Sequence, residues 1–271
     1  VMLAALIIPI IMARFKVSSI PTAIAEIITG IILGKSFLNI VNPNWTLNMM
    51  SSMGVIMLMF LSGMEINFDL FRKTPGKKRD SKSPVVMASQ AFGLIIAAAL
   101  IIAIVISRLG LFKDVLLATI IFSTVALGVV IATLKEKDIL QKPVGQTILL
   151  TAVLGEVVPM LALTFYASIN GGNARRLWLI VLLFLAAFIL LRRFKQPYVW
   201  FNKISKSTTQ LDVRLAFFLI FALVTIAETV GAENILGAFL AGMVMKLLQP
   251  SETTEDRLNS IGYGFLIPFF F

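Results

Sequence analysis

One carboxylate stands in the middle of a long apolar stretch of this sequence. Residues 145–166 read GQTILLTAVLGEVVPMLALTFY, and Glu156 is the one charged residue among them. A helix of that length rises about 33 Å, which is enough to cross the hydrocarbon core of a bilayer. A charged side chain at that depth costs at least ~2.5 kcal/mol, and such residues usually serve an ion or proton pathway. Glu156 is therefore a candidate ion- or proton-binding carboxylate, and the alternative is a buried glutamate paired for packing.

The backbone on both sides of Glu156 is weakened. Gly155 precedes it and Pro159 follows it. Both residue types are tolerated inside a membrane helix where neighbouring groups satisfy the freed carbonyls. Thr151 is a further candidate oxygen ligand, although a spacing of five residues aligns it imperfectly with Glu156 on one helical face.

A second polar point lies at mid-depth in the apolar segment 114–134, at Ser123 and Thr124. Serine and threonine hydroxyls can bind the backbone of their own helix and loosen it. One interpretation is an ordinary span with such back-bonded hydroxyls. The other is a helix broken at depth, whose half-helix ends and free carbonyls face an ion. The residues alone leave both interpretations open.

Glu26 lies about one turn inside another apolar segment, SIPTAIAEIITGIILGKSFL. Gly30 and Gly34 follow it four residues apart, which is typical of a helix that packs closely against another. The structural interpretation is a tightly packed helix. The functional one makes Glu26 a pathway or gating carboxylate.

The composition excludes most soluble classes of protein. The chain has 271 residues, of which 58% are hydrophobic and 14% charged, and its mean hydropathy is +0.94. Soluble domains carry about a quarter charged residues, so we expect an all-α polytopic membrane protein. The sequence has no histidine and no cysteine, which excludes Ser-His hydrolysis, histidine-ligated zinc and disulfides. We therefore expect neither an enzyme nor a cofactor.

The order of apolar segments predicts the topology. Ten segments are expected, at 1–13, 20–40, 48–66, 84–106, 114–134, 145–167, 176–194, 210–229, 233–248 and 259–271. The loops after the odd-numbered segments, together with the segment ends beside them, hold 18 Lys and Arg residues, not counting Arg214 at the start of the eighth segment. The other loops with their segment ends hold five. Base-rich loops are cytoplasmic by the positive-inside rule, so the N-terminus is expected outside. The net charge of +10 then reflects orientation and not nucleic-acid binding.

Six stretches in this order resemble the monovalent cation:proton antiporter-2 branch of the cation–proton antiporter superfamily. They are IPTAIAEIITGIILG at 20–34, FLSGMEI at 60–66, FSTVALGVVIATLKE at 122–136, AVLGEVV at 152–158, ILGAFLAGM at 235–243 and IGYGFLIPFFF at 261–271. The resemblance covers the whole chain.

The resemblance implies an inverted-repeat antiporter fold with a dimerisation panel and a mobile core. It makes Ser123–Thr124 the unwound part of a broken core helix, and it places Gly155–Glu156 where such proteins carry an acidic pair. Glu156 matches the second acid, which binds cation and proton in turn, and Gly155 departs from the pattern because it has no side chain. The implied activity is exchange of Na⁺ or K⁺ for H⁺ in a bacterial-type plasma membrane, by a homodimer that needs no cofactor beyond the transported ions.

Two other functions fit the same residues. A cation channel would conduct without proton counterflow, and a membrane sensor or scaffold would keep the fold without transport. Residues 1–271 are expected to form one incomplete transmembrane domain, truncated at both ends, that lacks the second half of the core. The small residues between Gly237 and Gly242 predict a close-packing face, which we expect to serve in dimerisation.

Overall fold

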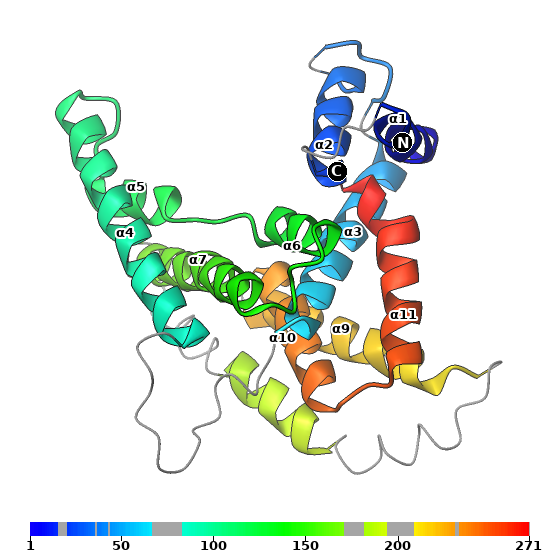
Figure 1. Ribbon diagram of the computed structural model, residues 1–271. Coiled ribbons are helices and arrows are strands. Elements are labelled where there is room, and N and C mark those ends of the chain that lie inside the picture. The colour runs from blue at the N-terminus through cyan, green and yellow to red at the C-terminus, as the bar shows by residue number, and fades with distance from the viewer. Residues whose placement is uncertain are drawn as a thin grey trace. The chain divides into compact units, whose positions relative to one another are not determined.

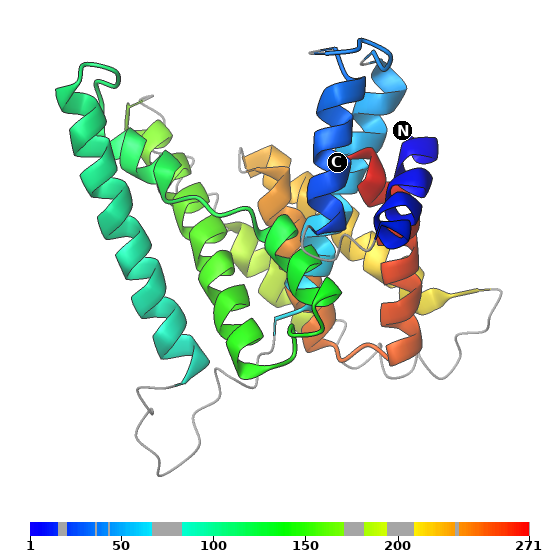
Figure 2. The same ribbon diagram turned by 45° about the horizontal axis from the view of Figure 1, so that its top comes forward.

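Figures 1 and 2 show a computed structural model that describes residues 1–15, 21–35, 37–42, 44–66, 83–170, 182–193, 209–230 and 233–270. These residues form helices joined by turns, with no strand in the described ranges. The predicted all-α class is confirmed. The chain divides into two compact units.

The first unit comprises Val1–Glu65, Leu183–Thr229 and Asn234–Phe271. A helix at 182–193 has most of its length in this unit. The other helices of the unit are α1 (Met2–Arg14), α2 (Thr22–Leu33), α3 (Trp45–Met64), α9 (Leu211–Val230), α10 (Asn234–Leu247) and α11 (Glu252–Ile261), followed by a π-helical turn at Gly262–Leu266 and a 3₁₀ turn at Ile267–Phe269.

Glycines bring α3 and α10 into backbone contact. A Cβ atom at Gly242 would clash with the carbonyl oxygen of Phe60, and one at Gly63 would clash with that of Phe239. Gly237 likewise lies against α9, where a Cβ atom would stand 2.6 Å from the Leu223 carbonyl oxygen. The close-packing face predicted on α10 therefore exists, but its use in dimerisation was wrongly predicted. The face is buried against helices of the same chain.

Two predicted segment boundaries differ from the structure. The tenth segment was predicted from residue 259, but α11 begins at Glu252, because Ser251 caps it by accepting a hydrogen bond from the Thr254 amide at 3.3 Å. The first turns of α11 are polar, so hydropathy alone does not show them. The second segment was predicted to reach residue 40, but α2 ends at Leu33, and Gly34 takes an extended conformation.

The second unit comprises Ile66–Leu182 and Val230–Glu233, and it holds α4 (Pro84–Arg108), α5 (Val115–Phe122), α6 (Leu127–Glu136) and α7 (Pro143–Asn170). Side chains cap two of these helices: the Ser83 hydroxyl accepts from the Val86 amide, and the Asp114 carboxylate accepts from the Leu117 amide at 2.9 Å. Helix α7 packs against α4, α5 and α6. An extended connection between α5 and α6 is visible in both views (Figures 1 and 2).

Several described helices have the length and composition of membrane spans. Four candidates are long and apolar enough: Trp45–Met64, Pro84–Arg108, Val115–Glu136 and Pro143–Leu163. Three shorter apolar helices are α1, α2 and α10. The two longest base-rich loops were predicted at 67–83 and 192–209, and all but their end residues lie outside the described ranges. Their cytoplasmic location stays a prediction.

Candidate functional site

The segment 114–134 is a broken helix. Helix α5 ends at Phe122 and α6 begins at Leu127. The Ser123 hydroxyl donates to the Ile120 carbonyl at 2.9 Å, and the Thr124 hydroxyl donates to the Ile121 carbonyl at 2.7 Å. These side chains bind carbonyls of the last turn of α5, which a continuing helix would pair with backbone amides. Of the two interpretations of this segment, the break is the one that the structure contains.

Gly155, in α7, binds the segment between α5 and α6 through its carbonyl oxygen. Its carbonyl oxygen would normally accept from the amide of residue 159, but Pro159 has no N–H. The amide of Val125, inside the break, donates to this oxygen at 2.9 Å. A Cβ atom at Gly155 would stand 2.5 Å from Val125 Cγ2 and 2.9 Å from Val125 Cβ. Glycine at position 155 therefore leaves the room that the Val125 side chain occupies beside α7.

Glu156 caps the second half of the broken helix. Ala126, the N-cap residue of α6, makes no side-chain cap. The Leu127 amide, the first of the helix, donates instead to Glu156 Oε2 at 3.1 Å. The positive end of a helix dipole favours a negative charge at this position. The carboxylate is half-buried, and its other oxygen is bound by none of the described residues.

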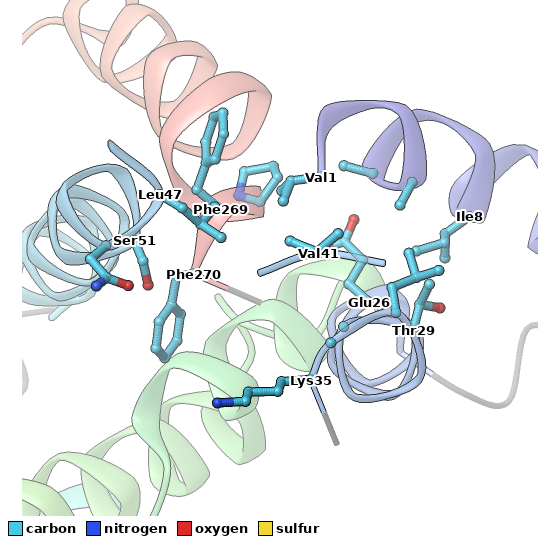
Figure 3. Close-up of a pocket in the computed structure, with 17 residues that line it drawn as sticks. Val1, Ile8, Glu26, Thr29, Lys35, Val41, Leu47, Ser51, Phe269 and Phe270 are labelled. Atoms are coloured by element: carbon cyan, nitrogen blue, oxygen red, sulfur yellow. The ribbon is translucent and has the colours of Figure 1, made fainter. Parts of the chain in front are cut away.

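The remaining predicted residues lie at different distances from this arrangement. The carbonyl oxygen of Ser123 lies 3.7 Å from where a Cβ atom of residue 155 would stand, so the break brings Ser123 to the site. Thr124 is exposed. The Thr151 hydroxyl donates to the Thr147 carbonyl of its own helix at 2.8 Å. Glu26 belongs to the first unit, where it lines a cavity (Figure 3), and its role in an ion pathway stays a prediction.

The backbone amides of Val125 and Leu127 are the part of the site that the sequence does not reveal. They lie about 30 residues from their partners in the chain. One signal was available: Pro159, four residues after Gly155, leaves a carbonyl that needs a donor from elsewhere. A further tie joins α5 and α7 near their ends, where the Tyr166 hydroxyl donates to Asp114 Oδ2.

This arrangement offers one carboxylate and several neutral oxygens and amides. Within the described ranges, no three Asp, Glu, His or Cys side chains cluster as metal ligands. A single carboxylate can hold one proton or share in binding one monovalent cation. The geometry thus suits a site whose occupant changes, with the Leu127 amide holding the carboxylate in place.

Comparisons with known proteins identify the family of this chain. The sequence profile described as "Sodium/hydrogen exchanger, transmembrane" matches residues 2–271. The chain is 42% identical over its whole length to a Bacillus subtilis protein named "Putative Na(+)/H(+) antiporter YjbQ", of which it covers 45%. It is 25% identical to the "Na(+)/H(+) antiporter" of Enterococcus hirae and 24% identical to the "Na(+)/H(+)-K(+) antiporter GerN" of Bacillus cereus.

In these last two comparisons, 93% of the chain aligns with 65% and 64% of the relative. The chain thus spans less than two thirds of the length of each of these curated relatives. The match over nearly every residue, together with the apolar helices, identifies an integral multi-pass membrane protein. The chain belongs to the sodium/hydrogen exchanger transmembrane family.

Proposed function

We propose that the full-length protein exchanges Na⁺ or K⁺ for H⁺ across the membrane, with Glu156 as the shared binding site. The observation that carries this proposal is the capping of α6 by Glu156 through the Leu127 amide at 3.1 Å. It fixes one carboxylate oxygen at the break and leaves the other to an incoming ion. Relatives named as Na⁺/H⁺ antiporters support the same class of transport.

Proton and cation compete for this carboxylate. A proton neutralises Glu156, and a cation requires its charged form, so the two occupants exclude each other. Carbonyls at Ser123 and Thr124, with Thr151 as a further oxygen, complete a shell that suits a hard cation. Position 155 adds no second carboxylate, because a side chain there would meet Val125. One proton per monovalent cation follows, and the exchange is electroneutral.

Alternating access then moves the site between the two sides of the membrane without fuel beyond the ion gradients. The division of the chain into two compact units supports a mobile core that contains α4 to α7 and a separate panel. We place the N-terminus outside, in a bacterial-type plasma membrane, on the distribution of basic residues. The protein is proposed to work as a homodimer through a surface other than the buried glycine face of α10.

The test uses the full-length protein in proteoliposomes with a pH-sensitive dye inside. A Na⁺ or K⁺ gradient should drive proton counterflow, and Glu156→Gln should abolish it. The variant should still fold, because the glutamine side-chain oxygen can accept from the Leu127 amide. Normal exchange by a well-folded Glu156→Gln protein would contradict the proposal. Cation current without proton counterflow would indicate a channel, and no flux in the unaltered protein would indicate a scaffold.

A second measurement tests direct competition. At pH values below the pKa of Glu156, the half-saturating cation concentration should rise tenfold for each unit of acidification if one proton is exchanged per cation. A steeper dependence would indicate a second acid at the site. A half-saturating concentration that does not change with pH would exclude competition at Glu156.

A further inference from the structure

The residues between α5 and α6 alternate in burial. Ser123 and Leu127 are buried, Val125 is half-buried, and Thr124 and Ala126 are exposed. An alternation with a period of two is typical of extended backbone and not of a helix. Val125 therefore lies on the inner side of this segment, between the two residues whose backbone groups belong to the proposed site.

The Val125 side chain fills the room that Gly155 leaves beside Glu156. A Cβ atom at position 155 would stand 2.5 Å from Val125 Cγ2 and 2.9 Å from Val125 Cβ. The same point lies 3.7 Å from the carbonyl oxygen of Ser123, which is one of the proposed cation ligands. The methyl groups of Val125 thus form an apolar wall next to the proposed cation site.

An apolar wall at this place excludes water from one side of the bound cation. A buried water molecule needs about three hydrogen-bond partners, and methyl groups supply none. The attraction between two charges rises as their distance falls, and water between them weakens it. Because Na⁺ is smaller than K⁺, it approaches a carboxylate oxygen more closely. With water excluded, this closer approach favours Na⁺ over K⁺.

We propose that Val125 is a specificity-determining residue, which makes the site at Glu156 select Na⁺ over K⁺. This inference rests on the proposed function, since it takes Glu156 as the cation-binding group. Val125 gives the cation no ligand of its own through its amide, which donates to the Gly155 carbonyl at 2.9 Å. It acts through the room that its side chain occupies. All residues of this contact belong to the second compact unit.

The test compares Na⁺ and K⁺ binding to the full-length protein in detergent. The melting temperature rises with the concentration of a ligand that binds the folded state, so titration with each salt gives an apparent dissociation constant. One alkaline pH keeps protons from competing, and choline chloride holds the ionic strength constant. The unaltered protein should bind Na⁺ about tenfold more tightly than K⁺.

Removing the wall should reduce this preference. In a Val125→Gly protein, a water molecule of about 30 Å³ enters beside Glu156, where the carboxylate and the Ser123 carbonyl bind it. The preference for Na⁺ should fall to about threefold or less, and Val125→Ala should give an intermediate value. A swapped protein, Val125→Gly with Gly155→Val, returns the same side chain to this space from α7. Exchanges that conserve volume are tolerated best, so its preference should recover to about tenfold.

Leu134→Ala on α6 is the control for lost packing. Leu134 is 3% exposed and lies two helical turns after Leu127. This variant should lower the melting temperature without cations and leave the ratio of the two dissociation constants unchanged. Gel filtration confirms that each protein is folded. An unchanged ratio in Val125→Gly, no recovery in the swapped protein, an equal fall in Leu134→Ala, or no preference in the unaltered protein would each overturn the proposal.

Cation-driven proton flux in proteoliposomes, measured on the same proteins, separates this inference from the proposed function. Flux in the unaltered protein together with an unchanged ratio in Val125→Gly would contradict the role of Val125 alone. Cation binding without flux would contradict the proposed exchange, and the ratio of dissociation constants would still decide the role of Val125.

Discussion

The amide of Val125 donates to the carbonyl oxygen of Gly155 at 2.9 Å, and this carbonyl is the one that Pro159 deprives of its helical partner. The helix break at Val125 and the proline in α7 therefore each supply the hydrogen-bond partner that the other lacks. The break after α5 leaves an amide without a helical acceptor, and the proline in α7 leaves a carbonyl without a helical donor. In a bilayer, where water supplies neither partner, such pairing avoids a cost of several kcal/mol.

Replacing Pro159 tests this pairing. In a Pro159→Ala protein, the new amide at position 159 competes with Val125 for the Gly155 carbonyl. A net hydrogen bond contributes about 1 kcal/mol, so we expect hydrogen exchange at the Val125 amide to be about five- to tenfold faster. Exchange measured by mass spectrometry on peptides that cover 123–127 would show it. Pro143→Ala is the control, because Pro143 is the first residue of α7 and breaks no helical bond.

Adding a methyl group at Gly155 should destabilise the second unit. The new Cβ atom would stand 2.5 Å from Val125 Cγ2, and overpacking of this kind costs about 1–3 kcal/mol. Gly155→Ala should therefore lower the melting temperature in detergent, and Val125→Gly in the same chain should recover part of the loss. Gly93→Ala on α4 is the matched control, since a Cβ atom there meets nothing within 4 Å. Equal melting of the two alanine variants would contradict the close approach.

The hydrogen bond from Tyr166 to Asp114 predicts how the stability of the protein depends on pH. The hydroxyl of Tyr166, and after it the Leu117 amide, lowers the pKa of Asp114, which precedes the span at Val115–Glu136. A lowered pKa means that the folded state prefers the charged carboxylate. The stabilisation is complete at neutral pH and is lost only as the pH falls through the lowered pKa.

Tyr166→Phe should accordingly reduce the melting temperature modestly, and by the same amount at pH 7 and pH 5. Thermal melts followed by gel filtration measure this offset. An offset that disappears between these two pH values would mean that another group is responsible.

Cysteine labelling tests the topology at two described positions. Lys113 lies before α5 in a loop predicted outside, and Lys137 lies after α6 in a loop predicted inside. Both side chains are exposed, and the chain has no cysteine of its own. In a cysteine-free full-length background, an impermeant thiol reagent should label Lys113→Cys in intact cells and Lys137→Cys only after the cells are opened. The reverse pattern would invert the topology.

Hydropathy predicted the helices. Local hydroxyl chemistry marked Ser123 and Thr124 as the place of a possible break, but it left a continuous span as an open alternative, and only the family resemblance implied the break. The hydroxyls of Ser123 and Thr124 donate to carbonyls three residues earlier at the end of α5. Such local hydrogen bonds can be predicted from the sequence of one segment. The cap on α6 could not be read in this way, since Glu156 and Leu127 meet only through folding.

The small residues of α10 correctly predicted a close helix contact, but the dimerisation partner that we expected for this contact was wrong. Gly237 and Gly242 signal that something packs closely on α10, but the spacing of glycines does not say whether a second chain or the same chain supplies the neighbour. Here the neighbours are α9 and α3 of the same chain. Polar first turns hid the start of α11 for a different reason, because a capped amphipathic helix end has no hydropathy signal.

The crossing of α3 and α10 has a practical consequence for measuring motion. The backbones touch at Gly63 and Gly242 with no side chain between them, so these helices cannot slide past one another without steric clash. Spin labels on the two helices should report the same separation in every state of a transport cycle. The distance between labels on α3 and α10 can therefore serve as a fixed reference for measuring displacements elsewhere in the protein.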